Sequence, residues 1–212
     1  MNRRALLATL GASIAGCAGC VSAVNGGPPT SDGSDSIFEA SEVQRRVSLG
    51  EVDDAPVSKV SLDAELLNGT VTGEGPARVR VSLTNEGKSK RLTDNEGECA
   101  LFNRRGGASD PAGVSLHQPE FPGYTGECRH YSRRGNRWRL DRPSSEDCRV
   151  LSYGCESVAY EAGETRATTY QLWDDHTVEG YMPPDTYRFK AQVAVDEESF
   201  DWGFSVVVES PE

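Results

Sequence analysis

From about residue 56 onward, apolar and polar residues alternate along the chain with a period of two. In residues 78–83 the apolar side chains Val79, Val81 and Leu83 share one face, and in residues 187–195 the odd positions do so. Alternation of β-branched and aromatic residues with polar ones is typical of strands with one buried face. The pattern predicts strands at residues 59–67, 78–84, 98–102, 137–140, 156–160, 166–173, 186–195 and 201–208.

Turn residues separate several of these strands, as in Asn-Gly at 68–69, Asn-Glu-Gly at 85–87 and Pro-Pro-Asp at 183–185. Seven to eight short strands joined in this way predict an all-β fold, an antiparallel β-sandwich. The side chains that share inward parity along the strands should form its core. They are Val60, Leu62, Val79, Val81, Leu83, Leu101, Tyr170, Leu172, Tyr187, Phe189, Val193, Phe204 and Val206.

The chain before the strands has a different composition. Residues 21–35 are rich in Gly, Pro and Ser, which predicts a flexible tether. Residues 36–39 have capping-box spacing and predict a short helix to about residue 46, whereas 47–52 suit an edge strand equally well. We therefore expect a signal peptide at 1–16, a tether with a short helix at 17–55, and a sandwich at 56–212 with a cysteine-bearing insertion at 103–157.

The first residues carry two export motifs in the correct order. Arg3-Arg4 precedes an apolar stretch that is too short for a membrane span, and the pair resembles a twin-arginine export signal. Residues 14–17 (Ile-Ala-Gly-Cys) resemble a lipobox, whose last residue, Cys17, takes the lipid. Cys20 fits the lipobox pattern less well. The alternative is an ordinary secretory signal, but the two motifs together predict a lipid-anchored protein on the outer face of the cytoplasmic membrane.

The net charge of the chain bears on the salt content of the medium that surrounds the protein. The formal net charge is −11, from 33 acidic and 22 basic residues. An acidic surface suits a high-salt medium, because salt screens the self-repulsion; simple solubility is the alternative explanation. Excess negative charge repels nucleic acid, so DNA or RNA partners are not expected.

Of the six cysteines, two lie in the leader and four in the folded part. In an exported protein an even number of cysteines predicts disulfides. Among the three possible connectivities we expect Cys99–Cys155 and Cys128–Cys148. A zinc site on the same cysteines is the alternative, but the closest internal pair has six residues between its members, which is wider than usual for zinc.

The segment 123–142 breaks the acidic trend, because six arginines alternate there with aromatic side chains. In a chain with 33 acidic residues, the favoured interpretation is internal pairing of these arginines with the protein's own carboxylates. The alternative is a docking loop for an envelope protein or an anionic glycan, because guanidinium groups beside aromatic rings can stack on them and bind carboxylates or phosphates. The candidate docking residues are Arg129, Tyr131, Arg133, Arg134, Arg137, Trp138, Arg139 and Arg142.

The sequence has few of the motifs that are typical of enzymes. The sequence has no nucleophile elbow, zinc-protease motif or phosphate-binding glycine loop, so we expect no catalytic residue, metal or cofactor. The pair Asp174-Asp175 is expected on the solvated surface. Asn68-Gly69-Thr70 is a glycosylation sequon that makes Asn68 a candidate glycan site.

Several short motifs suggest a family. They are VSLTN at 81–85, AGE at 162–164, YQLWD at 170–174 and PPDTY at 183–187. With these motifs, residues 77–208 resemble the BsuPI-like intracellular proteinase inhibitors, which implies an immunoglobulin-like sandwich and inhibition of a proteinase. The whole chain looks like a haloarchaeal surface lipoprotein. Asp185 departs from the family pattern, which has glycine there, and the region 106–155 is unusually long.

Three functions follow from these features. We expect a lipid-anchored surface module that binds a partner or has a structural role, without catalysis. An envelope proteinase inhibitor is the alternative, which an exposed apolar tip among residues 103–127 would favour. An exported enzyme is the third, which a deep pocket with converging carboxylates would favour.

Overall fold

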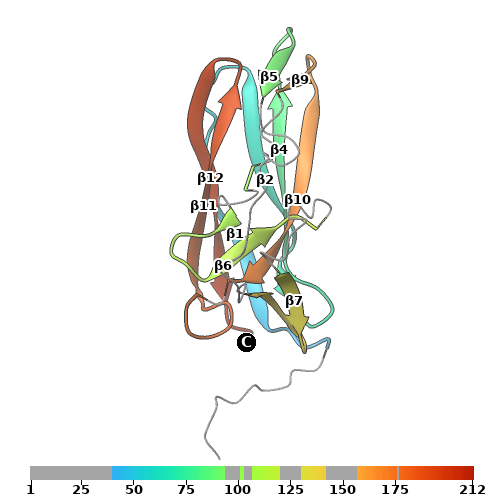
Figure 1. Cartoon of the computed structure of the whole chain (residues 1–212), viewed down its shortest axis with the longest axis vertical. Coiled ribbons are helices and arrows are strands. Elements are labelled where there is room, and N and C mark those ends of the chain that lie inside the picture. Colours follow the sequence, from blue (N-terminus) through green and yellow to red (C-terminus); the bar gives the residue numbers. More distant parts are fainter. Residues whose placement is uncertain (1–39, 94–100, 103–106, 120–129, 142–156, 176) are drawn as a thin grey trace, which may run out of the picture. The chain divides into compact units, whose positions relative to one another are not determined.

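The computed structural model describes residues 40–93, 101–102, 107–119, 130–141, 157–175 and 177–212 (Figure 1). Contacts divide the chain into two units, Met1–Asp35 and Ser36–Glu212, of which the first lies outside the described residues. The described part of the second unit contains strands and no helix. It forms two sheets that enclose one core, which confirms the predicted all-β sandwich.

The first sheet, sheet A, has six strands that all pair antiparallel with their neighbours. Its long central pair is formed by β11 and β12, which align over the whole length of β11. The order is β3 (Thr70–Val71), β1 (Arg45–Val52), β12 (Glu198–Glu209), β11 (Asp185–Val195), β5 (Arg91–Thr93) and β9 (Val158–Tyr160).

The second sheet, sheet B, is built on β4, which pairs antiparallel with β2 and β10. On its other side β10 pairs antiparallel with β6 and makes one parallel pair with β8, between Asp174 and Arg139. The order is β2 (Val60–Asn68), β4 (Arg78–Asn85), β10 (Thr165–Asp174), β8 (Arg137–Asp141) and β7 (His130–Arg134), with β6 (Val114–His117) also on β10.

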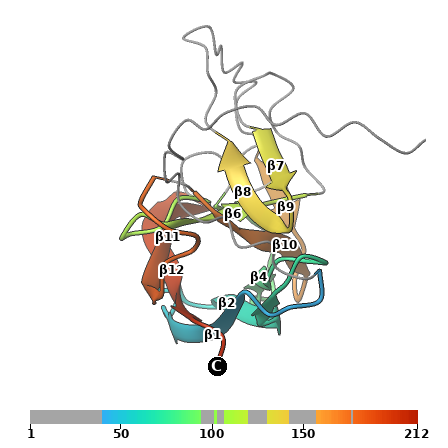
Figure 2. The same ribbon diagram turned by 90° about the horizontal axis from the view of Figure 1, so that it is seen from below.

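The chain closes the sandwich along both of its sides. On one side β2 of sheet B continues through Gly69 into β3 of sheet A, next to β1. On the other, Asp110 pairs with Arg188 of β11 and the chain then enters β6 on β10. Viewed end-on, β1 lies beside β2 on the first side and β6 crosses the second (Figure 2).

The corner between β2 and β3 is held by the Asn68 side chain. Its Nδ2 donates to the carbonyls of Thr70 at 3.0 Å and Pro76 at 3.2 Å. Its Oδ1 accepts from the backbone N–H of Thr70 at 3.1 Å and from the Thr70 hydroxyl at 3.0 Å. A side chain at Gly69 would meet the Val47 carbonyl at 2.6 Å, so only glycine fits this crossing.

Every side chain that the sequence predicted for the core is buried, with at most 7% of its surface exposed. The centre is aromatic: Phe102 packs against Phe204 at a ring-centroid distance of 5.2 Å, and Phe189 lies 5.4 Å from Phe204. Tyr170 and Trp202 each lie 6.0 Å from Phe102. This cluster joins the inner faces of β10, β11 and β12.

The described residues form twelve strands, more than the seven to eight expected, and the extra strands are mostly short. The alternative of a strand at 47–52 is the one found: β1 begins at Arg45, and the predicted helix to residue 46 is wrong for residues 40–46. The folded domain therefore begins before residue 56. Of the predicted strand 98–102, the structure describes only Leu101 and Phe102, and these form a turn. Phe102 has a φ of 60°, which lies outside the range of a β-strand.

Candidate functional site

The arginine-rich segment, predicted as a loop, is a β-hairpin where the structure describes it. Strands β7 and β8 pair over their full length and are joined by Gly135 and Asn136. Gly135 has a φ of 59°, which suits a two-residue hairpin turn that begins with glycine. Gly-Asn between two polar runs is a known hairpin signal that the sequence interpretation overlooked.

Arg139 of this hairpin is paired inside the domain. Its Nε donates to Asp174 Oδ2 at 2.5 Å, and its Nη2 donates to the Gly180 carbonyl at 3.1 Å. The Asp174 side chain is fully buried, and its Oδ1 accepts from the Met182 N–H at 2.9 Å. Burial raises the pKa of Asp174, although the bond from Met182 and the Arg139 guanidinium act in the opposite direction.

Arg137 and Arg45 both lie against the ring of Tyr181. Their guanidinium carbons are 5.2 Å and 5.6 Å from the ring centroid. Arg45 Nε also donates to the Met182 carbonyl at 2.7 Å. Burial raises the pKa of Tyr181 to about 12, so its hydroxyl stays protonated and accepts the backbone N–H of Trp138 at 3.1 Å. These cation–π contacts fix the loop that joins β10 to β11.

Trp138 is half-buried and belongs to an aromatic cluster. Its ring lies 5.2 Å from Trp173, which in turn lies 5.4 Å from His117. Its indole Nε1 donates to the Thr72 carbonyl at 2.8 Å. The cluster therefore ties the hairpin to β6, to β10 and to the segment after β3.

Three of the candidate docking residues, Arg137, Trp138 and Arg139, thus make contacts within the domain. Arg129 and Arg142, and the side chains of Tyr131, Arg133 and Arg134, lie outside the described part of the structure. Arg139 pairs with a carboxylate of the domain, as internal pairing predicts, whereas Arg137 contacts the ring of Tyr181. A docking role for the others stays a prediction.

The expectation that Asp174 and Asp175 are solvated is wrong, because both are buried. Asp175 Oδ2 accepts from the Gly113 N–H at 2.8 Å, and Oδ1 accepts from the N–H and the hydroxyl of Thr177 at 2.9 Å and 2.8 Å. Among the residues that the structure describes, no group of three or more His, Cys, Asp or Glu is arranged to hold a metal ion. Through these hydrogen bonds both carboxylates hold the segments that contain Gly113, Thr177 and Met182 against the end of β10.

Burial lowers the pKa of His117 to about 4. The folded state therefore favours the neutral imidazole, and this contribution to stability is complete above the unfolded pKa of about 6.5. We expect it to be lost as the pH falls from about 6.5 towards about 4. Chemical denaturation of wild type and His117→Gln at several pH values measures the effect. Equal losses of stability in the two proteins over this interval would contradict it.

The other sites predicted from the sequence can be placed only in part. Cys17, Cys99, Cys128, Cys148 and Cys155 lie outside the described residues, so the anchor and the disulfides stay predictions. Asn68 of the sequon is half-buried at the corner between the sheets. Because Nδ2 donates two hydrogen bonds there, a glycan on this nitrogen would remove at least one of them.

Within 103–127 the structure describes residues 107–119. The exposed side chains in that stretch include the small Ala108, Pro111 and Ala112, while Val114 and Leu116 are buried. This described stretch offers no large apolar tip of the kind that would favour an inhibitor. No helix in the described residues has the length and apolar character that a membrane crossing requires.

At the end of the domain that carries β5 and β9, the buried side chain of Asn85 connects several turns through hydrogen bonds. Its Nδ2 donates to the carbonyls of Ser89, Tyr160 and Glu161 at 2.9 Å, 3.0 Å and 3.1 Å. Its Oδ1 accepts from the Gly87 N–H at 3.0 Å. One amide group thus joins the turn after β4 to the turn before β10.

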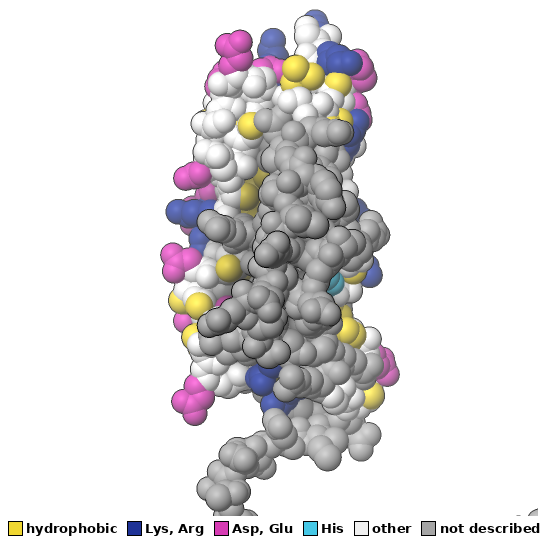
Figure 3. Space-filling model, viewed as in Figure 1, with side chains coloured by type: hydrophobic (Ala, Val, Ile, Leu, Met, Phe, Trp, Pro, Cys, Tyr) yellow, Lys and Arg dark blue, Asp and Glu magenta, His cyan; other side chains and the backbone are white. Residues whose placement is uncertain are grey.

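Asp196 extends this network to the turn between β11 and β12. Its carboxylate accepts from the Leu92 N–H at 2.9 Å and pairs with Arg91 at 3.1 Å. Charged side chains of both signs gather at this end of the molecule (Figure 3). Leu92 of β5 is 48% exposed. We call this region the distal end, because β1 starts and β12 finishes at the opposite end of the sandwich.

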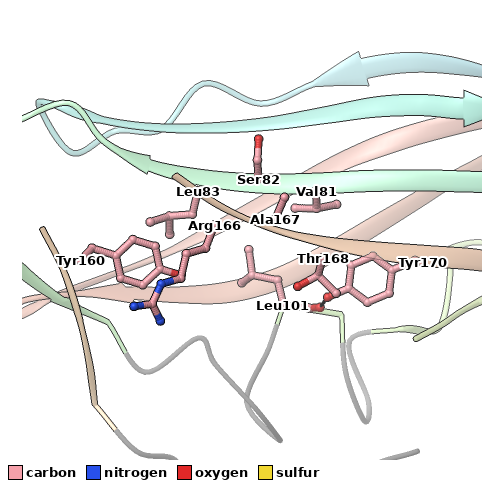
Figure 4. Close-up of a pocket in the computed structure, with 9 residues that line it drawn as sticks. All are labelled: Val81, Ser82, Leu83, Leu101, Tyr160, Arg166, Ala167, Thr168 and Tyr170. Atoms are coloured by element: carbon pink, nitrogen blue, oxygen red, sulfur yellow. Dashed lines mark hydrogen bonds between the residues drawn. The ribbon is translucent and has the colours of Figure 1, made fainter. Parts of the chain in front are cut away.

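An open pocket of about 320 Å³ lies against sheet B near the distal end. In Figure 4, Arg166, Thr168 and Tyr170 of β10 point to one side of the sheet, towards Leu101 and Tyr160, while Ser82 points away. The lining residues are Val81, Ser82, Leu83, Leu101, Tyr160, Arg166, Ala167, Thr168 and Tyr170. No Asp or Glu is among them, so this is not the carboxylate-lined pocket that would favour an enzyme.

The geometry defines the protein as a two-sheet β-sandwich whose distal end is held together by the hydrogen bonds of Asn85 and Asp196. Comparisons with protein-family models, curated proteins and solved structures found no match for this chain.

Proposed function

We propose that the protein is a lipid-anchored module of the outer cell surface, which binds a partner or has a structural role in the envelope without catalysis. Cys17 would carry the lipid, and the stretch after it would connect the lipid to the sandwich. The acidic composition, with a net charge of −11, would suit an external medium of high salt.

One observation carries the proposal: the chain enters and leaves the sandwich at the same end. Arg46 of β1 pairs with Glu209 of β12, so the start of β1 and the end of β12 are neighbours. An anchor that precedes β1 would hold this end towards the membrane. The turns at the distal end, which Asn85 and Asp196 hold together, would then face outward as a pre-organised surface. Pre-organisation lowers the entropy cost of binding a partner.

The anchor is tested with Cys17→Ser, and Cys20→Ser is the matched control. We expect the wild type and the Cys20→Ser variant in the membrane fraction, with Cys17 as the modified first residue of the mature chain by intact mass. Cys17→Ser should release the protein from the membrane, because one thioether-linked lipid group is its only proposed attachment. A mature chain that starts elsewhere, or membrane retention of Cys17→Ser, would refute the proposal.

A further inference from the structure

The start of β1, the turn after β3 and the tip of the β7–β8 hairpin lie together at one end of the sandwich (Figure 1). A Cβ atom at Gly73 would lie 2.8 Å from the Cβ atom of Asn136 and 2.9 Å from the carbonyl oxygen of Ala40, so the three segments touch. Gln44, the residue before β1, donates from Nε2 to the Asn136 carbonyl at 2.5 Å. Its side chain is fully buried, which is uncommon for glutamine. The hairpin tip therefore covers the chain at the point where it enters the sandwich.

The hairpin also holds Arg45, the first residue of β1, through Tyr181. Arg45 Nη2 donates to the Tyr181 carbonyl, and the guanidinium groups of Arg45 and Arg137 both lie against the Tyr181 ring. Trp138 donates from its backbone N–H to the Tyr181 hydroxyl at 3.1 Å and from its indole N–H to the Thr72 carbonyl at 2.8 Å. The contacts of Trp138 thus connect the hairpin to the residue that holds Arg45 and to the segment after β3.

The hairpin is itself fastened to the body of the sandwich. Arg139 of β8 pairs with the fully buried Asp174 of β10 at 2.5 Å, and the Trp138 ring lies 5.2 Å from the Trp173 ring. Backbone pairing joins β8 and β10 at the same place. A hairpin that is tied to β10 in this way can restrain the start of β1.

The start of β1 is also where the sequence first offers a basic cleavage site after the leader. No lysine or arginine occurs between Arg4 and Arg45, and Arg45-Arg46 is a dibasic pair. Both residues lie within sheet A, where Arg46 pairs with Thr70 of β3 and with Glu209 of β12. A proteinase cuts such a segment after the chain has opened locally, so the rate of cleavage follows the population of the open state.

We propose that the β7–β8 hairpin is a strap that closes over the start of β1 and shields the Arg45-Arg46 site from proteinases with basic specificity. To open β1 at this end, the chain must give up the hydrogen bond from Gln44 to the hairpin and the contacts of Arg45 with Tyr181, besides its pairing with β3 and β12. One consequence rests on the proposed function: with a lipid on Cys17, this site is the first at which such a proteinase would separate the sandwich from its anchor. The strap itself does not depend on the anchor.

Hydrogen exchange of backbone amides, followed by NMR on the full chain under conditions where exchange reports the opening equilibrium, tests the strap. Trp138→Ala removes the indole hydrogen bond and the ring contacts of the hairpin. Exchange of the Gln44 and Val47 amides, which are hydrogen-bonded to β3 and to the residue before it, should become about tenfold faster, the effect of one hydrogen bond and one aromatic contact. The Asp196 amide, which is hydrogen-bonded at the distal end, is the internal control and should not change.

Equal acceleration at both ends would indicate a global loss of stability and would overturn the proposal, as would unchanged exchange at Gln44 and Val47. If Trp138→Ala does not fold, Trp138→Phe replaces it. This variant loses only the indole hydrogen bond and should accelerate exchange of the same two amides about fivefold.

Limited digestion of the full chain with trypsin tests the protective role. Mass spectrometry of the first cleavage products gives the rate of cutting after Arg45 and Arg46, which should rise about tenfold in Trp138→Ala, in step with amide exchange. Cutting after Lys88, which is exposed at the distal end, is the internal control and should stay the same. Wild-type cutting after Arg45 or Arg46 that is as fast as cutting after Lys88 would overturn the proposal. Cys17→Ser should leave all of these rates unchanged, so an error in the lipid site would not alter the result.

Discussion

Replacing Phe189 with alanine is expected to lower the free energy of unfolding by about 3–5 kcal/mol. The Phe189 ring is fully buried between Phe204 at 5.4 Å and Phe102 at 6.5 Å, so the truncation leaves a cavity that rigid strands on both sides cannot close. Urea denaturation monitored by Trp fluorescence measures the change. The matched control is Lys190→Ala on the exposed face of the same strand, for which we expect a change within about 0.5 kcal/mol.

A near-neutral result for Phe189→Ala would mean that the register of β11 is wrong. Side chains alternate between the two faces of a strand, and a shift by one residue would place Phe189 on the surface and Lys190 in the core. The two substitutions would then exchange their effects. The pair therefore tests the pairing of β11 with β12 as well as the size of the core contribution.

Replacing Asp174 with alanine is expected to cost about 3 kcal/mol, the lower end of the range for breaking a buried ion pair. The substitution leaves the Arg139 guanidinium and the Met182 N–H without the acceptor that they share, and the Arg139 side chain is only 30% exposed to water. Thermal and chemical denaturation both report the loss. Glu179→Ala, an exposed carboxylate in the loop that follows, is the control and should be nearly neutral.

The double variant Asp174→Ala with Arg139→Met separates the two causes of this loss. Removing both charges takes away the unpaired cation, so part of the stability should return, as for other buried pairs replaced by apolar residues. The Met182 N–H would still lack its partner, and that part of the loss should remain. A double variant that is less stable than Asp174→Ala would show that Arg139 contributes through contacts other than the pair, such as its bond to the Gly180 carbonyl.

The core was predictable from the sequence because period-two alternation specifies one face of each long strand. Where strands are short, as in β3, β5 and β9, two or three residues carry no recognisable period. The conformation of β1 was ambiguous from the sequence. Val47 is the one buried apolar residue in the first half of this strand, and its neighbours are an arginine and a serine. Pairing with β12 decided its conformation, and such long-range pairing leaves no mark on the local sequence.

The sites were less predictable, since they depend on residues far apart in the chain. Arg139 and Asp174 are separated by 35 positions and meet only because β8 and β10 lie side by side. In the sequence the arginines form one group, whereas the fold gives Arg137 and Arg139 different partners. The pocket has no sequence signature, because β4, β9, β10 and Leu101, which line it, are separate segments of the chain.

The position of β1 has a mechanical consequence. A pull on the chain ahead of Arg45, opposed by a partner held at the distal turns, would act along the strand axis. The hydrogen bonds between β1 and β12 run across that axis, from Arg46 and Glu209 to Val52 and Phe204, so they would be loaded together in shear and would not open one after another. A domain pulled in this way would resist extension with its whole strand at once, which would suit the surface location proposed above.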